Sequence, residues 1–173
     1  MPDAYAMISE EESASGLGAA FRAVRDRTLA LTAGLGPEDM VVQSMPDASP
    51  TKWHLAHTSW FFEALILGEA PGYQPVDPRF QTLFNSYYEA EGQRHARHAR
   101  GLLTRPALSR ILEYREHVES AIFAQWSNLP PRALDLIELG IQHEQQHQEL
   151  LLTDILHLFA QNPMQPAYWP SDS

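Results

Sequence analysis

Two histidines four residues apart, His143 and His147, are the side chains of this 173-residue chain best suited to metal chemistry. They lie in the stretch 136–158, which has no proline, one glycine and strong helix formers at most positions, so it is predicted to be helical. Residues four apart share one helix face, which brings the two imidazoles close enough to bind one ion. The spacing alone leaves two other interpretations open, an exposed pair or buried histidines satisfied by hydrogen bonds.

The segment His-Glu-Gln-Gln-His at 143–147 also fits the His-Glu-x-x-His pattern of zinc proteases, in which the glutamate is the general base. Such enzymes take their third ligand from downstream, where only Asp154, His157 and a short tail remain. The chain also has little of the alternating pattern of strands that could hold a peptide substrate. The sequence therefore disfavours a protease, and Glu144 is expected to orient a ligand or to face solvent.

The elements that must position these histidines are predicted to be four helices. Their expected limits are Ser13 to Gly34 or Gly36, the N-cap Ser49 to Gly68, the cap Thr104 to Trp126, and a last helix through 136–158 that ends at Asn162–Pro163. The link between the third and fourth helices is short and the other links are long. This pattern predicts an all-α four-helix bundle with long crossover connections, in whose core side chains from different helices can converge on one ion.

The chain is expected to consist of one folded domain between two tails. Residues 1–12 are polar, acidic and aperiodic and are predicted to be a flexible tail, residues 13–163 form the helical domain, and residues 164–173 form a second tail. In the loop 37–50, residues 40–45 are a candidate for a short extended piece packed on the bundle. The connection 68–104 is far longer than usual and is rich in aromatics and arginines, which favours a functional loop over a merely solvated one.

The composition bounds the class of protein. A chain of 173 residues with 44% apolar residues suits one well-packed globular domain. No apolar run approaches the ~20 residues of a membrane span. The N-terminus lacks the basic start and apolar core of a signal peptide, so we expect a cytoplasmic protein. The absence of cysteine excludes disulfides and thiolate ligands. The net charge of −10 argues against general nucleic-acid binding, which needs an electropositive surface.

A third histidine, His57, lies in the second predicted helix on the face shared by Trp53, Trp60 and Phe61. A lone histidine in such surroundings is often structural. The wider pattern of four blocks in order is more specific. The blocks are Trp53-His-Leu-Ala-His-Thr-Ser-Trp-Phe-Phe-Glu63, Leu83-Phe-Asn-Ser-Tyr-Tyr-Glu89, Arg100-Gly-Leu-Leu-Thr-Arg-Pro106 and His143-Glu-Gln-Gln-His-Gln-Glu149. Together they resemble the N-terminal DinB-like domain of the ergothioneine-biosynthesis sulfoxide synthases of the EgtB type, from about residue 15 to residue 170.

The resemblance implies a function. It places one non-haem Fe(II) on His57, His143 and His147, with His57 preferred over His54 as the second histidine of its block. It implies a reaction in which a cysteine-containing thiol is joined to the imidazole C2 of Nα-trimethylhistidine with O₂ to give a sulfoxide. By motif position, Arg94 and Arg97 are expected to bind carboxylates of the thiol substrate, while no catalytic residue is assigned.

The family also carries a C-terminal domain like the formylglycine-generating enzyme, which shapes the pocket. This chain ends at Ser173, about where that domain would begin, so the resemblance implies such a partner domain in cis or in trans. Neutral imidazoles suit zinc and nickel as well as iron, because ligand softness does not select among them. Alternatives are therefore a stand-alone DinB-like thiol transferase or hydrolase that uses Zn(II) or Ni(II), and a structural or interaction domain that has lost its metal site.

Overall fold

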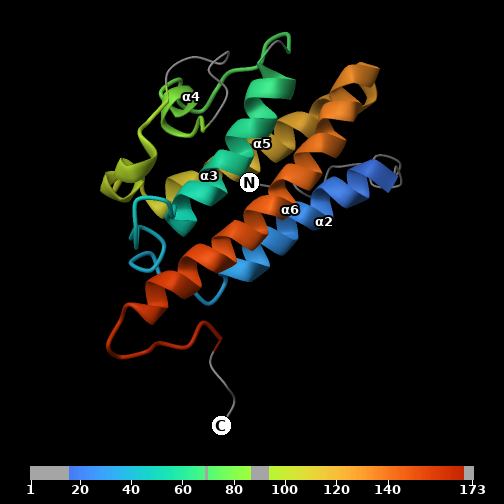
Figure 1. Cartoon of the computed structure of the whole chain (residues 1–173). Helices are drawn as coiled ribbons and strands as arrows, with labels where there is room; N and C mark the ends of the chain where they lie inside the picture. The colour runs from blue at the N-terminus through green and yellow to red at the C-terminus, as the bar shows by residue number, and fades with distance from the viewer. Residues whose placement is uncertain (1–15, 69, 87–93, 170–173) are drawn as a thin grey trace.

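The computed structural model describes residues 16–68, 70–86 and 94–169, and every regular element in these ranges is helical. The four long elements lie side by side (Figure 1): α2 (Gly16–Thr32), α3 (Thr51–Phe62) continued by the π-helix η2 (Glu63–Leu67), α5 (Leu108–Gln125) and α6 (Pro131–Ala160). The short elements are α4 (Phe80–Leu83), η4 (Arg97–Leu102) and η5 (Trp126–Asn128). The predicted all-α bundle is thus confirmed.

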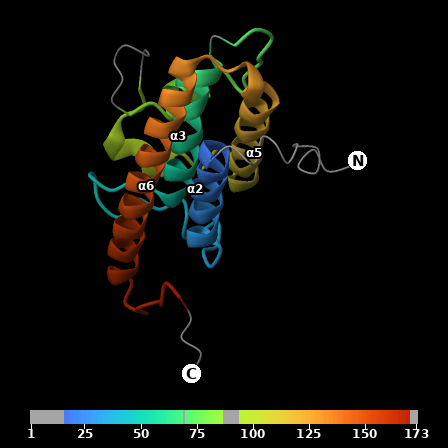
Figure 2. The same cartoon turned by 90° about the vertical axis from the view of Figure 1, so that its right-hand side faces the viewer.

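The order of the helices explains the long connection. In Figures 1 and 2, α2 and α6 run in one direction and α3 and α5 run in the other. Helix α6 packs on α2 and on α3, and α3 packs in turn on α5. Because α3 and α5 are parallel neighbours, the chain must return along the bundle between them, which gives the predicted crossover. This return segment includes α4 and η4 and passes beside the histidines.

Two predicted helix starts are wrong. The N-cap of α3 is Pro50 rather than Ser49, because the Ser49 N–H donates to Asp154 Oδ2 at 2.8 Å and its hydroxyl accepts from Arg100 Nη1 at 2.9 Å. The N-cap of α5 is Ala107 rather than Thr104, whose carbonyl accepts from Lys52 Nζ at 3.0 Å. In both places a side chain distant in sequence binds the residue that was expected to cap the helix: Arg100 binds the Ser49 hydroxyl, and Lys52 binds the Thr104 carbonyl.

The extended piece expected at 40–45 is also absent, since these residues form turns and bends. Met40 is nevertheless buried in the core, and its carbonyl accepts the Lys52 N–H at 2.9 Å. Of the two predicted tails, residues 1–12 lie outside the described residues. In the other tail, the Tyr168 hydroxyl donates to the Leu31 carbonyl, so Tyr168 packs against the end of α2.

Helix α3 lies at the centre of the bundle, and all twelve of its residues are buried. It packs tightly on α6 at Gly140, where an added Cβ would lie 2.2 Å from Phe62 Cε1. Only a glycine allows the two helices to come so near at this level. Since His143 follows Gly140 by about one turn, this contact sets the spacing between the histidine-bearing faces of α3 and α6.

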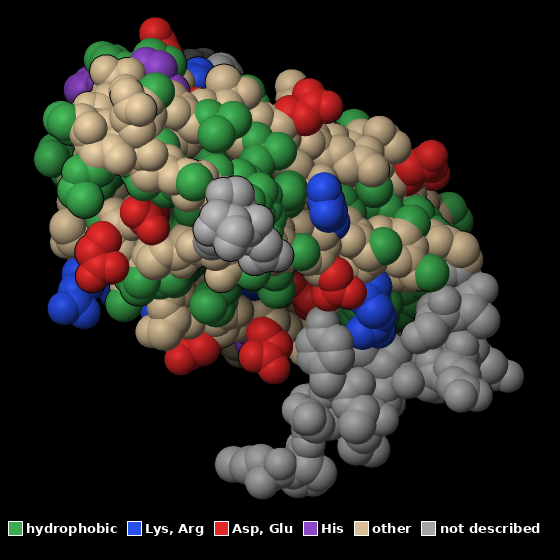
Figure 3. All heavy atoms as spheres, turned by 90° about the horizontal axis from the view of Figure 1, so that it is seen from below, with side chains coloured by type: hydrophobic (Ala, Val, Ile, Leu, Met, Phe, Trp, Pro, Cys, Tyr) green, Lys and Arg blue, Asp and Glu red, His purple; other side chains and the backbone are tan. Residues whose placement is uncertain are grey.

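The surface agrees with the acidic composition. Figure 3 shows Asp and Glu side chains scattered singly over the face seen from below, among hydrophobic and neutral polar groups, with few Lys and Arg side chains. Within the described ranges, none of the helices combines the length and the apolarity that crossing a membrane requires.

Candidate metal centre

His57 from α3 and His143 and His147 from α6 converge in the core of the bundle. Each contributes one ring nitrogen to a group in which the three atoms lie within 4.8 Å of one another. The His57 and His143 Nε2 atoms are 3.2 Å apart. We call these three residues the histidine cluster. The two α6 histidines share a face as their spacing predicted, and α3 supplies His57 rather than His54.

The ring of His57 is held on both faces and at one edge. It stacks on Trp53 and on Trp60, with centroid separations of 4.6 Å and 5.4 Å. Its Nδ1–H donates to the Phe84 carbonyl at 2.6 Å, which leaves Nε2 with a lone pair toward the other histidines. The two indoles are fixed in turn by the return segment, because Trp53 Nε1 donates to the Leu83 carbonyl at 3.2 Å and Trp60 Nε1 donates to Gln81 Oε1 at 3.0 Å.

The two α6 histidines are held differently from each other. His143 stacks on Phe61 at 4.2 Å, and its buried Nδ1 has no hydrogen-bond partner among the described residues. His147 Nδ1 lies 2.9 Å from His54 Nδ1, and His54 Nε2 lies 3.0 Å from Asp154 Oδ2. A carboxylate and a second imidazole thus stand behind His147, outside the histidine cluster.

The surroundings keep these imidazoles neutral. Burial lowers the pKa of His143 from its ordinary 6.5 to about 4. Burial and the neighbouring His143 hold the pKa of His57 well below its ordinary value, and burial together with His57 and His54 lowers that of His147. In the tautomer with the proton on Nδ1, the His57 and His143 Nε2 atoms turn their lone pairs toward each other, and a divalent cation between them would relieve the repulsion. The donor set therefore fits a metal ion of the kind that prefers nitrogen ligands.

Glu144, the acidic residue of the His-Glu-x-x-His pattern, does not face the histidine cluster or the solvent. It is completely buried, and its two oxygens accept from Arg25 at 2.9 Å and from Arg115 at 3.0 Å. Burial alone would raise the pKa of Glu144, but the charges of the two arginines outweigh it and hold that pKa below its usual range. The expectation that Glu144 orients a ligand or faces solvent is wrong, and a carboxylate held in this way is not free to act as a protease base.

The family is established by comparison. The sequence model of the DinB superfamily matches residues 20–151, well over half of the chain. The chain belongs to the DinB superfamily. The matched range contains His57, His143 and His147 and ends before Asp154. A comparison with curated proteins found no match.

A hollow of about 420 Å³ in this DinB domain leads to the histidines. Its lining is made of residues from three places along the chain: Ser49, Trp53, His54, Ser86, Arg97, Arg100, His143, Gln146, His147, Leu150 and Asp154. A second hollow of about 460 Å³ lies beside it and shares Ser86, Arg97 and Arg100 with it. Arginines of the return segment therefore border both hollows, beside two of the three clustered histidines.

The two arginines predicted to bind substrate carboxylates, Arg94 and Arg97, differ in which hollow they line. Arg97 lines both hollows and donates to the Asp47 carbonyl, whereas Arg94 lines only the second hollow, with Nη1 3.0 Å from the Ser86 carbonyl. Both side chains are exposed. Their role in binding substrate carboxylates stays a prediction.

Three residues of the site were missed by sequence reasoning. Arg100 is buried and lies over the Trp53 ring at 3.3 Å, where it forms a cationic wall of the hollow. His54 and Asp154 stand behind His147. A signal was present for the last two, because His54 precedes His57 by three residues and Asp154 follows His147 by seven, which places each on the helix face of a clustered histidine.

Proposed function

We propose that this chain is the iron-binding DinB domain of a non-haem iron sulfoxide synthase in ergothioneine biosynthesis. The observation that carries the proposal is the convergence of three neutral imidazoles, two of which line an open hollow that arginines border. Three nitrogen ligands leave coordination positions for a substrate and for O₂. Fe(II) bound there would supply thiolate binding and O₂ activation.

The overall reaction balances without a further reductant. The thiol loses its S–H and the imidazole C2 loses its C–H, a sulfur–carbon bond forms, one oxygen atom of O₂ ends on sulfur, and the other leaves as water with both hydrogens. This four-electron oxidation consumes one O₂. The substrates are a cysteine-containing thiol and Nα-trimethylhistidine. The hollow that would receive them is lined by the start of α3, the return segment and α6.

The residues of this chain would bind and orient the thiol substrate. Arg97 lies on the wall shared by both hollows, from which its guanidinium can reach a carboxylate while the sulfur points to the histidine cluster. Arg94 borders the outer hollow and suits a second carboxylate, such as that of a γ-glutamyl group. The buried Arg100 adds a fixed positive charge beside Trp53 that favours an anionic thiolate. A second domain like the formylglycine-generating enzyme, in cis or in trans, would cover the open side and complete the pocket.

The test is reconstitution without oxygen. The chain, joined to or mixed with such a second domain, is loaded with Fe(II), given a cysteine-containing thiol and Nα-trimethylhistidine, and then exposed to O₂. We expect the coupled sulfoxide by mass spectrometry, with no product from the variants His57→Ala, His143→Ala and His147→Ala. Absence of the sulfoxide from the complete, iron-loaded enzyme would refute the proposal.

A second function is favoured by the donor set, since three imidazoles bind Zn(II) or Ni(II) as readily as Fe(II). In that case the chain is a stand-alone metal-dependent thiol transferase or hydrolase, and its 173 residues suffice for activity. Metal analysis of protein purified without oxygen separates the two functions. Stoichiometric zinc or nickel without iron favours this alternative, and stoichiometric iron favours the sulfoxide synthase.

A further inference from the structure

Behind His147, a line of polar groups runs away from the histidine cluster to the surface. His54 Nδ1 lies 2.9 Å from His147 Nδ1, and His54 Nε2 lies 3.0 Å from Asp154 Oδ2. The same carboxylate oxygen accepts the Ser49 N–H at 2.8 Å, which fixes the position of Asp154 against the start of α3. His54 is buried, whereas Asp154 is partly exposed, so the line leads from solvent to the core.

The carboxylate determines the direction of every hydrogen bond in this line. A carboxylate only accepts, so His54 must donate its Nε2–H to Asp154. A neutral imidazole then has a lone pair on its other nitrogen, so His54 Nδ1 accepts and His147 Nδ1–H donates. His147 is left with its lone pair on Nε2, the nitrogen that stays free to bind an ion.

We infer that Asp154 and His54 are positioning residues, which hold His147 in the tautomer and orientation that binds a metal ion. This inference rests on the proposed metal-binding function and deepens it, because it names the residues that prepare one ligand. His57 is prepared in a comparable way by the Phe84 carbonyl, which accepts its Nδ1–H at 2.6 Å. Groups that orient a ligand histidine from behind typically contribute 10–100-fold to metal affinity.

The carboxylate can be removed or replaced conservatively. In Asp154→Ala the acceptor for His54 is lost, and both tautomers of His54 and His147 become accessible. In Asp154→Asn the amide oxygen can take the place of Oδ2 and accept from Ser49 and His54, so the direction of the hydrogen bonds is retained. Replacing His54 by Leu removes both groups of the link, whereas His54→Gln retains an acceptor and a donor.

The first experiment uses the metal-free chain. The ¹⁵N chemical shifts of the imidazole nitrogens report which nitrogen of each histidine carries the proton. We expect His147 to be protonated at Nδ1 in the wild-type chain and in Asp154→Asn, and to be a mixture of tautomers in Asp154→Ala. Protonation of His147 at Nε2 in the wild-type chain would overturn the inference, whatever the metal content.

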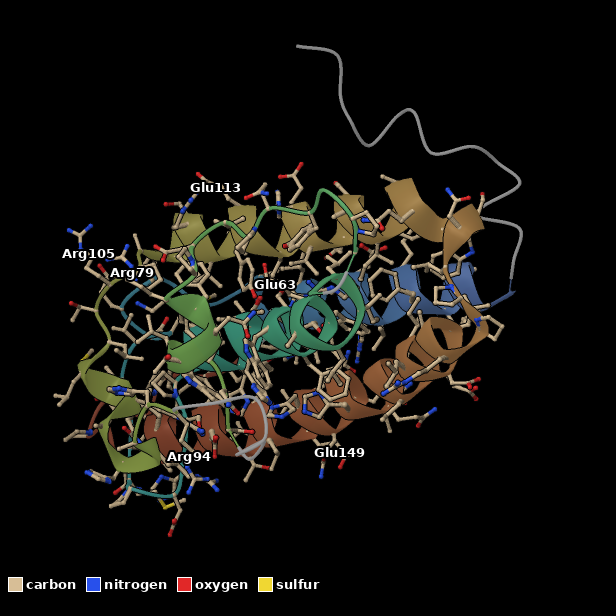
Figure 4. All side chains as sticks on the ribbon, turned by 90° about the horizontal axis from the view of Figure 1, so that it is seen from above. Glu63, Arg79, Arg94, Arg105, Glu113 and Glu149 are labelled. Atoms are coloured by element: carbon tan, nitrogen blue, oxygen red, sulfur yellow. The ribbon has the colours of Figure 1, made fainter. Side chains whose placement is uncertain are left out.

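The second experiment measures Co(II) and Fe(II) affinity under anaerobic conditions by competition with a chelator. Asp154→Ala and His54→Leu are expected to weaken binding by about 10–100-fold, with an altered Co(II) absorption spectrum, and Asp154→Asn and His54→Gln to recover most of the loss. The matched control is Glu149→Ala, another carboxylate of α6, which is exposed and points outward in Figure 4.

The outcomes separate the inference from the proposed function. If the wild-type chain binds neither ion, the proposed metal site is wrong. If the wild-type chain binds and Asp154→Ala binds equally well with the same spectrum, the site stands and the positioning role is wrong. Circular dichroism and thermal unfolding of each metal-free variant check that the bundle is folded before affinities are compared.

Discussion

Two buried polar clusters share helix α6 and differ in how their charges are satisfied. The ionic cluster consists of Arg25, Arg115, Glu119 and Glu144, two positive and two negative groups joined by contacts of 2.8–3.0 Å. Thr28 adds a hydrogen bond, since its hydroxyl donates to Glu144 at 2.7 Å, while Arg115 Nε has no hydrogen-bond partner among the described residues. The charges of the ionic cluster thus balance without a group from outside the chain.

The histidine cluster begins one residue earlier on α6, at His143, and lacks this balance. Its three imidazoles are held neutral by burial, so the converging nitrogens carry no charge of their own. Adjacent residues of one helix thus serve two purposes. Glu144 stabilises the bundle through opposite charges from α2 and α5, whereas His143 faces a site that only a cation from outside can complete. The contrast indicates which of the two buried polar clusters is suited to bind an ion.

The largest effect is expected from breaking the ionic cluster. Glu144→Gln leaves two buried arginines facing a single remaining carboxylate, that of Glu119. Removing one partner of a buried charge pair costs about 3–5 kcal/mol, so we expect a loss of that size in the free energy of unfolding. The measurement is urea unfolding of the metal-free protein at neutral pH. As a control, Glu149→Gln changes an exposed carboxylate of the same helix and is expected to stay within about 0.5 kcal/mol of wild type. A loss below about 1 kcal/mol for Glu144→Gln would contradict a structural role for the ionic cluster.

The histidine cluster should show the opposite behaviour, with stability that depends on an added ion. At a free metal concentration 100 times its Kd, bound Co(II) or Fe(II) should raise the free energy of unfolding by about 2.7 kcal/mol. His143→Gln should lose this gain. In the metal-free state it should change stability by no more than about 1 kcal/mol, because Nδ1 of His143 has no partner to lose and Nε2 has a single contact, with His57 Nε2 at 3.2 Å.

Unfolding with and without metal measures this difference directly. Glu144→Gln provides the crossed control, since it should lower stability in both states while retaining most of the gain on metal addition. An equal gain on metal addition in wild type and in His143→Gln would show that the ion binds elsewhere.

The contact between α3 and α6 sets the geometry of the histidine cluster and is expected to be less costly to disturb. Gly140→Ala places a Cβ against the Phe62 ring, with the nearest atom at 2.2 Å. Overpacking of this kind costs about 1–3 kcal/mol, and the separation of the two helices should also weaken metal binding. Gly16→Ala is the matched control, because an added Cβ there meets nothing within 4 Å. If Gly140→Ala lowers stability but leaves metal affinity unchanged, the contact does not set the spacing of the histidines.

The sequence predicted those parts of the site that depend on a single helix. The spacing of His143 and His147 fixes their common face, so their convergence followed from helix geometry. The crossover between α3 and α5 followed from the length of the link, and His57 was chosen by resemblance to a family motif. These predictions required no knowledge of how the helices are rotated against one another.

The remaining parts depended on contacts between distant segments. Glu144 was misread because its partners come from α2 and α5, and nothing in the pattern around it indicates a buried ion network. Ser49 and Thr104 were misread as caps because Asp154, Arg100 and Lys52 bind their polar groups from elsewhere in the chain. His54 and Asp154 were missed for the same reason, since their meeting requires α3 and α6 to cross at one particular level.

The two clusters are also expected to respond to pH over different ranges. The pKa of His143 lies near 4 in the folded protein and at its ordinary 6.5 in the unfolded chain, and the pKa values of His57 and His147 are lowered in the same direction. Between these values the unfolded chain binds protons that the folded chain does not, so stability falls as the pH falls. Each histidine contributes a slope of up to about 1.4 kcal/mol per pH unit in the metal-free protein.

The ionic cluster should respond only at lower pH. The folded pKa of Glu144 lies below its ordinary 4.5, so its contribution is lost only as the pH falls below about that value. Metal-free His143→Gln should therefore show a shallower decline in unfolding free energy between pH 6.5 and 4 than wild type, while Glu149→Gln should follow wild type throughout. Parallel declines for wild type and His143→Gln in this window would mean that His143 is already protonated in the folded protein. In that case the histidine cluster would hold a proton where the proposed function requires a metal ion.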